Sequence, residues 1–177
     1  MVFAITASII SYLHKINNIS VENMNAEFVN PFLSSFINVL QTMAQIEVKP
    51  GKPSLKKDAI ARGDVSGLIG MVGPTAKGSF SISFDKPLAL NVFRLMVGEE
   101  IEDISDDITD MVGEITNMVA GGAKRQLGEK GFEFSMATPI VVSGPSHTIK
   151  HQVDGSKVLM PFTSEHGSAF IEICFNQ

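Results

Sequence analysis

The chain has 177 residues, of which 44% are hydrophobic, and its formal net charge is −5. This length and apolar share suit a single compact domain with its own hydrophobic core. No stripe of basic residues alternates with aromatic residues, and a mildly acidic surface is not attracted to anionic lipid. We therefore expect neither a nucleic-acid partner nor a membrane partner.

The first 23 residues differ in character from the rest of the chain. Val2–Leu13 is largely apolar, but threonine and serine interrupt it, it is too short to cross a bilayer, and it lacks the basic start of a secretory signal. We expect residues 1–23 to be an N-terminal extension ahead of a domain that covers 24–177. An additional amphipathic helix that docks on the domain or on a partner is the alternative.

The single cysteine, Cys174, cannot form an internal disulfide. It lies in an apolar run, Phe170–Phe175, which predicts a small buried core residue and not a nucleophile. The lack of any disulfide framework is typical of a reducing compartment, so a cytoplasmic location is expected.

Two groups of side chains have the composition of a metal site but not its geometry. His147 and His151 are four residues apart, yet Pro145–Val153 has the pattern of a turn and a strand, on which they would lie too far apart to share an ion. We expect them at polar surface positions. A cluster of aspartates lies at a helix start, where acidic residues commonly compensate the helix dipole: Asp103, Asp106, Asp107 and Asp110. We expect no metal ion or cofactor bound by the chain itself.

The first half of the domain begins with a helix and continues with strands. Apolar residues at helical spacing predict a helix over Ala26–Ile46, with Pro31 in its first turn. Pro50–Pro53 breaks the chain. Two strand-like runs follow, Ser66–Val72 and Gly78–Phe84. In the second run Phe and Ile alternate with Ser, which predicts a half-buried antiparallel strand.

The second half has two helices and then more strands. Lys86–Val97 is predicted to be a helix that ends at Gly98, and Ser105 offers the N-cap of a long helix that runs to about Leu127. The remaining strand-like runs are Glu133–Met136, Ile140–Val142, Thr148–Gln152, Val158–Phe162 and Ser168–Phe175. Because strands are grouped and do not alternate with helices, this order favours an α+β fold with two layers, helices packed on an antiparallel or mixed sheet.

The long helix is amphipathic, with its polar residues on one side. At 100° per residue, one stripe is apolar and is expected to face the core: Ile108, Met111, Val112, Ile115, Met118 and Val119. Asp110, Glu114, Asn117 and Gly121 fall on the opposite side. Glu114 and Asn117 are three residues apart, so their side chains emerge as neighbours.

A polar outer face alone is what any amphipathic helix shows, but the glycines add to it. Gly113, Gly121 and Gly122 each cost about 1 kcal/mol relative to alanine within a helix. They leave a surface of low relief around the polar pair, which would let another backbone come close. Crowded helix packing within the domain is the alternative explanation.

The sequence around this pair resembles a known family. Gly113–Met118, which reads Gly-Glu-Ile-Thr-Asn-Met, and the Ala-Gly-Gly-Ala-Lys run at 120–124 look like the signature helix of the CheX branch of the CheC/CheX/FliY phosphatases. The Ala-Glu-Phe-Val-Asn-Pro-Phe run at 26–32 resembles the opening helix of that branch. The resemblance covers roughly residues 24–177.

The resemblance implies a CheC-like fold and a substrate, the aspartyl phosphate of a CheY-like receiver domain, whose active site supplies its own Mg²⁺ and lysine. It implies that Glu114 pairs with that lysine and that Asn117 positions the hydrolytic water. Further residues of the same helix are expected to contact the partner: Asp110, Gly113, Gly121 and Lys124. It also implies a homodimer joined through sheet edges, for which a late strand such as Val158–Phe162 is a candidate.

Asparagine suits the positioning of water. Its carbonyl accepts a hydrogen bond from water while its NH₂ donates to other oxygens, and it is neutral, so it can approach a phosphoryl group without the repulsion of a carboxylate. A second Glu-x-x-Asn occurs at Glu27 and Asn30. Because Pro31 biases Asn30 away from helical geometry and bulky residues crowd it, we interpret this second pair as first-turn or capping residues.

Two other classes of function remain open on the sequence. The same surface could hold a receiver domain without hydrolysing its phosphate, or the chain could be a structural dimer module with a solvated polar face. A conventional hydrolase is not expected, because the chain has no Gly-x-Ser-x-Gly elbow, no P-loop and no evident Ser/His/Asp arrangement.

Overall fold

The computed structural model describes residues 26–74 and 76–176, so the expected extension at 1–23 lies outside the described residues. The described helices are α2 (Ala26–Met43), α3 (Lys86–Val97) and α4 (Asp106–Gly128). The strands are β1 (Lys49–Pro50), β2 (Ser54–Lys56), β3 (Val65–Val72), β4 (Lys77–Phe84), β5 (Ser135–Met136), β6 (Ile140–Ser143), β7 (Lys157–Ser164) and β8 (Gly167–Asn176).

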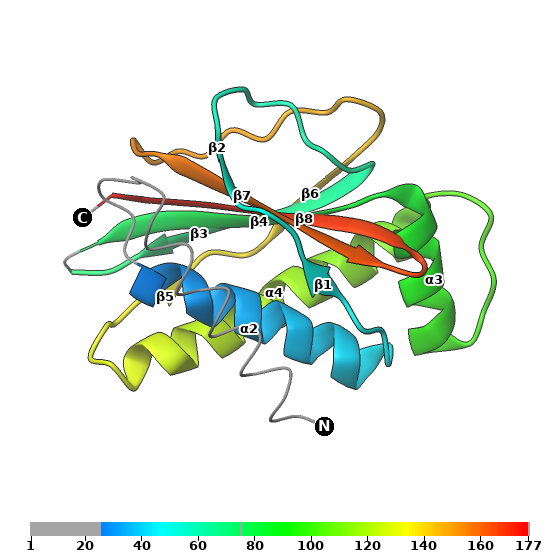
Figure 1. Cartoon of the computed structure of the whole chain (residues 1–177), viewed down its shortest axis with the longest axis horizontal. Helices are drawn as coiled ribbons and strands as arrows, with labels where there is room; N and C mark the ends of the chain where they lie inside the picture. The colour runs from blue at the N-terminus through cyan, green and yellow to red at the C-terminus, as the bar shows by residue number, and fades with distance from the viewer. Residues whose placement is uncertain (1–25, 75, 177) are drawn as a thin grey trace.

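All eight described strands form one antiparallel sheet in the order β1-β7-β8-β4-β3-β5, with β2 also paired to β7 and β6 also paired to β3. Helices α2 and α4 lie side by side across one face of this sheet, and α3 stands at one end (Figure 1). The predicted α+β architecture is confirmed, and the sheet is antiparallel throughout the described residues.

The helix boundaries follow local signals. Helix α3 is capped by the Asp85 carboxylate, which accepts from Leu88 N–H at 2.9 Å, and it ends at Gly98 in the left-handed conformation. Helix α2 ends earlier than expected, at Met43, because Gln45 adopts a φ of 56° and turns the chain out of the helix. Pro31 lies inside α2 and past its first turn, so that part of the prediction is wrong.

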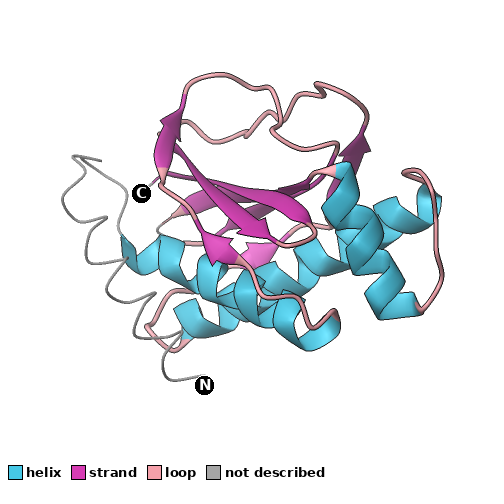
Figure 2. Cartoon of the chain, turned by 45° about the vertical axis from the view of Figure 1, so that its right-hand side comes forward, coloured by secondary structure: helices cyan, strands magenta, loops and turns pink. Residues whose placement is uncertain are grey.

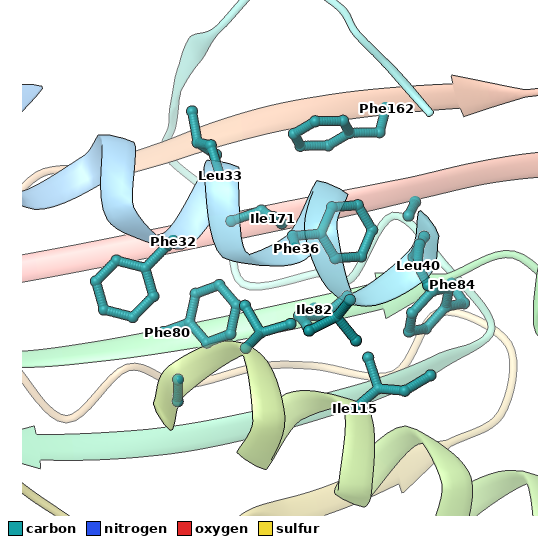
Figure 3. Close-up of a cluster of buried hydrophobic side chains, with 14 of the residues drawn as sticks. Phe32, Leu33, Phe36, Leu40, Phe80, Ile82, Phe84, Ile115, Phe162 and Ile171 are labelled. Atoms are coloured by element: carbon teal, nitrogen blue, oxygen red, sulfur yellow. The ribbon is translucent and has the colours of Figure 1, made fainter. Parts of the chain in front are cut away.

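The main core fills the space between the helices and the sheet. Figure 3 shows aromatic rings of α2 packed onto rings that project from the central strands, with Ile115 of α4 closing the layer. The Phe32 and Phe80 ring centroids are 4.8 Å apart, and those of Phe36 and Phe162 are 5.0 Å apart. Aromatic pairs at these separations contribute about 1 kcal/mol beyond the area that they bury. The core therefore fixes α2 and α4 to the sheet along their length.

The other face of the sheet is also covered, which the sequence did not predict. The segments 51–64 and 144–156 arch over it, opposite the helices (Figure 2). As a result β4 is buried on both faces and not half-buried, and its serines are buried with its phenylalanines: Ser79, Ser81 and Ser83. Thr148–Gln152 belongs to this covering layer and is not a strand, apart from one bridge between Ile60 and Thr148.

Strand β7 lies inside the sheet, so it is not the expected edge for a dimer. One side of β7 pairs with β8, and its other side pairs with β1 and β2. These two short strands lie around Pro50–Pro53, whose prolines predict only a break. Among the described residues, β6 pairs only with β3, which makes β6 an edge strand.

Candidate functional site

Helix α4 is held by close backbone contacts on its buried side. A β-carbon on Gly67 of β3 would overlap Thr116 Oγ1, and one on Gly122 would overlap Ser35 Oγ of α2. Thr116 itself donates to the Val112 carbonyl at 2.7 Å, which satisfies its hydroxyl without solvent. These glycines let α4 lie close to both β3 and α2. Crowded packing therefore explains Gly122.

The buried face of α4 is rotated from the predicted stripe. The buried residues are Ile108, Met111, Val112, Ile115, Thr116, Val119, Ala120, Ala123 and Leu127. Met118 is 38% exposed, so its predicted place in the core is wrong. The small residues at 116, 120 and 123 pack inward instead, because α4 meets both the sheet and α2.

The exposed face of α4 forms one wall of an open groove with a volume of about 720 Å³. Glu114 and Asn117 are both exposed, and both line this groove. They share that wall with Asp110 and Gly113, as the spacing of the sequence predicts. Four of the six predicted site residues are thus brought together.

The other two predicted residues lie further along α4 and do not line the groove. A β-carbon on Gly121 would meet no atom within 4 Å, so this glycine is open to solvent and nothing inside the described chain requires it. Lys124 is exposed and lines a separate hollow with Val72 and Phe132. Lys124 is thus exposed and Gly121 partly exposed, and both lie on the same helix as the groove residues.

The opposite wall of the groove was not predicted. It is formed by the chain from Met136 to Val141, which leaves β5 and enters β6. Ala137 N–H donates to the Gly70 carbonyl at 3.0 Å, and Val141 Cγ2 lies 3.4 Å from where a β-carbon on Gly113 would stand. A β-carbon at position 113 would therefore make only an ordinary contact with this wall, which does not itself require a glycine there. The Pro139 turn in the sequence marks a loop but not its position beside α4.

A second polar cluster lies on the outer face of the sheet, away from the groove. Glu172 accepts from Lys56 Nζ at 2.5 Å and lies 3.3 Å from His151 Nε2, and His151 Nδ1 lies 2.5 Å from Ser79 Oγ. The Lys56, His151 and Glu172 side chains are at most 1% exposed. Burial raises the pKa of Glu172, but hydrogen bonds from His151 and Lys56 outweigh it and hold that pKa below its ordinary value.

The serine, histidine and glutamate of this cluster are in the order of a hydrolase triad, an arrangement that the sequence did not reveal. Ser79 is only 4% exposed in the middle of β4, and Lys56 neutralises the carboxylate. A nucleophile needs access to its substrate, so we interpret the cluster as structural. The one available signal was Glu172 in the middle of an apolar strand.

His147 and His151 are not at the surface positions that we predicted. His151 belongs to this cluster, and His147 is half-buried with Nε2 2.7 Å from Ser66 Oγ. No group of three or more His, Cys, Asp or Glu side chains in 26–74 or 76–176 is placed to hold a metal ion. Cys174 is buried, as predicted, and burial raises the pKa of its thiol.

The second Glu-x-x-Asn pair does not present an equivalent surface. Glu27 is exposed in the first turn of α2, with a carboxylate oxygen 3.8 Å from Lys130 Nζ. Asn30 is a helical residue beyond that turn, so its predicted first-turn or capping position is wrong. Its Oδ1 is buried and makes no hydrogen bond, and so does not face a partner as Asn117 does.

Comparisons with known proteins identify the family. The family model described as chemotaxis phosphatase CheX matches residues 65–163, which include α4 and both walls of the groove. The curated CheY-P phosphatase CheX of Thermotoga maritima is 31% identical over 128 residues, which cover 72% of this chain and 82% of that protein.

Two solved structures extend the comparison. A CheC-like superfamily protein from Shewanella sp. PV-4 is 62% identical, covering 87% of this chain and 100% of that one, with a TM-score of 0.83. The complex of CheX, CheY, BeF3 and Mg²⁺ from Borrelia burgdorferi matches at 27% identity, covering 85% of this chain and 98% of that one, with a TM-score of 0.72.

The fold and the match to the family model thus define a phosphatase of the CheC-like superfamily. Within that superfamily, the chain belongs to the chemotaxis phosphatase CheX family. It is therefore a hydrolase by family. None of the described helices is both long enough and apolar enough to cross a membrane.

Proposed function

We propose that the chain removes the phosphoryl group from the aspartyl phosphate of a CheY-like receiver domain, with Asn117 and Glu114 as its catalytic residues. The observation that carries this proposal is the exposure of both side chains on one wall of an open groove, on a helix whose opposite face is buried. Both side chains are therefore accessible to a neighbouring protein surface. The relatives named CheY-P phosphatase and CheX–CheY complex support the choice of partner.

Asn117 has the chemistry to position the attacking water. Hydrolysis of an aspartyl phosphate needs water in line with the phosphorus and stabilisation of a loose, charged transition state. The Asn117 carbonyl accepts a hydrogen bond from that water, and its neutrality avoids repulsion by the phosphoryl oxygens. Orientation of this kind lowers a barrier by several kcal/mol.

Glu114 is proposed to align the helix over the phosphorylated pocket by pairing with a lysine of the receiver. A carboxylate is tolerated beside a phosphoryl group when a cation lies between them. Asp110, one turn earlier, adds a second negative charge to the same wall, and Gly113 between them keeps the surface low. In this proposal Glu114 binds the receiver and Asn117 positions the water.

The metal in this reaction is proposed to come from the receiver. The Borrelia burgdorferi complex contains CheX, CheY, BeF3 and Mg²⁺. In our proposal a phosphorylated receiver likewise brings its own Mg²⁺, and the chain supplies side chains only. We place this encounter in the cytoplasm, in line with the reducing compartment that the lack of a disulfide framework indicates.

We further propose a homodimer that pairs along β6. This strand has one edge without a partner in the described sheet, and Ile140 and Val142 beside that edge are 64% and 39% exposed. An apolar strand edge of this kind is a template for pairing with a second chain. Antiparallel pairing of two β6 strands would cover it.

The decisive experiment measures phosphate release from a panel of receivers phosphorylated by a small-molecule donor. The parent chain should accelerate release from at least one receiver. Asn117→Ala should reduce that acceleration by about a hundredfold or more while the affinity for a BeF3-activated receiver changes little. Glu114→Ala should weaken both, and Glu114→Lys should weaken them further because it repels the receiver's lysine.

Met118→Ala is a matched control, because Met118 is exposed on the same helix but does not line the groove. An Asn117→Ala protein that releases phosphate as fast as the parent would contradict the assignment of the water. Binding of an activated receiver without any acceleration by the parent would favour a non-catalytic adaptor instead.

A further inference from the structure

His147 connects the end of β6 to the middle of the sheet. It lies in the covering layer, three residues after Gly144, which directly follows β6. Its Nδ1 is 2.8 Å from the Gly144 carbonyl oxygen, and its Nε2 is 2.7 Å from Ser66 Oγ. Ser66 Oγ is in turn 2.6 Å from Ser83 Oγ of β4. The ring thus contacts β3 and the turn after β6, and Ser66 extends the chain of hydrogen bonds to β4.

The partners of the ring fix where its proton lies. A backbone carbonyl only accepts, so Nδ1 must carry the proton that is donated to Gly144. In a neutral imidazole Nε2 is then an acceptor, and Ser66 Oγ–H donates to it. The Ser83 hydroxyl completes the chain by donating to Ser66 Oγ. Each donor in this chain has an acceptor, and the two serines are buried.

Strand β6 is also part of the groove. Its residues pair with β3 from Val65↔Ser143 to Leu68↔Ile140, and Val141 lines the groove opposite Glu114 and Asn117. The carboxyl end of β6 is held by His147 and by Gly144 N–H, which donates to the Asp64 carbonyl at 2.9 Å. The backbone turns sharply there, with φ values of 123° at Gly144 and 55° at Ser146.

We propose that His147 is a positioning residue for the phosphatase groove: through Gly144 and Ser66 it fixes β6 and therefore the wall that faces Glu114 and Asn117. The consequence for catalysis rests on the proposed function, but the effect on β6 does not. His147 itself touches no partner. It sets how closely the wall approaches α4, and so how well a receiver surface fits the groove.

The first test follows amide hydrogen exchange of residues 137–143 in the free protein by mass spectrometry. His147→Ala should speed exchange in this segment about tenfold, with little change in α4, because one hydrogen-bonded anchor is lost. His147→Asn should restore much of the protection, because its amide N–H₂ can donate to Gly144. His166→Ala is the control, since His166 lies in the hairpin between β7 and β8 and contacts Glu165.

A second variant distinguishes loss of the hydrogen bonds of the ring from loss of its volume. Ser66→Ala cuts the same chain from the other side and should act like His147→Ala. It keeps the test usable if the histidine variant folds poorly.

The second readout is kinetic and uses the receiver identified by phosphate release. His147→Ala should raise KM for the phosphorylated receiver severalfold and change kcat by less than twofold, because Asn117 stays on α4. Unchanged exchange in 137–143 would overturn the positioning role whether or not the chain is a phosphatase. Faster exchange with no change in KM would show that His147 stabilises β6 but does not position the groove for the receiver. A parent protein without phosphatase activity would count against the proposed function alone.

Discussion

Gly67 of β3 and Thr116 of α4 touch so closely that the strand has no room for a side chain at this point. A β-carbon on Gly67 would also stand 3.0 Å from Thr116 Cβ, so rotation of the threonine hydroxyl would not relieve the overlap. We expect Gly67→Ala to push α4 away from the sheet and to lower the free energy of unfolding by about 1–3 kcal/mol, as overpacking does.

Urea denaturation followed by circular dichroism measures this change. Gly70→Ala is the matched control, because Gly70 lies on the same strand and a β-carbon there would meet no atom within 4 Å. It should be neutral or slightly stabilising. Equal effects of the two substitutions would contradict the close approach of α4 to β3.

Substitutions of Gly121 can distinguish an effect on the stability of the fold from an effect on the binding of a receiver. Because the space around it is empty, Gly121→Ala should stabilise the chain by about 1 kcal/mol through helix propensity alone. If a receiver's backbone comes close at this point, Gly121→Leu should weaken binding of the activated receiver while the free protein stays folded. Thermal denaturation and titration calorimetry would measure the two effects, and unchanged affinity in Gly121→Leu would remove Gly121 from the partner surface.

Glu172 should make stability depend on pH at the acid end. Its pKa is lowered in the folded state, so its contribution is present above the ordinary carboxylate pKa of about 4.3 and is lost as the pH falls through the lowered value. Glu172→Gln should destabilise the chain at pH 7 by about 3–5 kcal/mol, because the buried Lys56 ammonium loses its partner. The free energy of unfolding of Glu172→Gln should then fall less steeply than that of the parent as the pH is lowered.

Denaturant unfolding at a series of pH values measures both parts of this prediction. Glu165→Gln is the control, since the Glu165 side chain is 86% exposed. A Glu172→Gln protein as stable as the parent at pH 7 would show that the buried pair adds nothing to the fold.

The dimer proposal predicts a charge-sensitive association. Replacement of Ile140 and Val142 by lysine places two like charges along each β6 edge and should convert a dimer to a monomer in light scattering coupled to gel filtration. Leu55→Lys, at an exposed residue of β2 on the other side of the sheet, is the control and should leave the mass unchanged. A dimer that survives the double substitution would place the interface elsewhere.

Periodicity was enough to predict α3, α4 and the longer strands, and to place Glu114 and Asn117 on an exposed face. It failed for Met118, because helical spacing does not reveal that α4 packs against α2 as well as the sheet. It also failed for β1 and β2, whose pairing with β7 depends on contacts far apart in the sequence. The buried His151 and Glu172 likewise meet only when the 144–156 layer folds over the sheet.

Helix α4 is anchored on its buried side by residues from Ile108 to Leu127, and the groove pair stands on the same rod. The backbone positions of the amide and the carboxylate are thus fixed by the core, so in the proposed function a receiver would meet a helix that does not need to refold. Loose complexes can then be productive, since alignment is independent of the strength of the association. The product can then dissociate rapidly without loss of the alignment that hydrolysis needs. Rapid dissociation would suit the turnover of a transient signal.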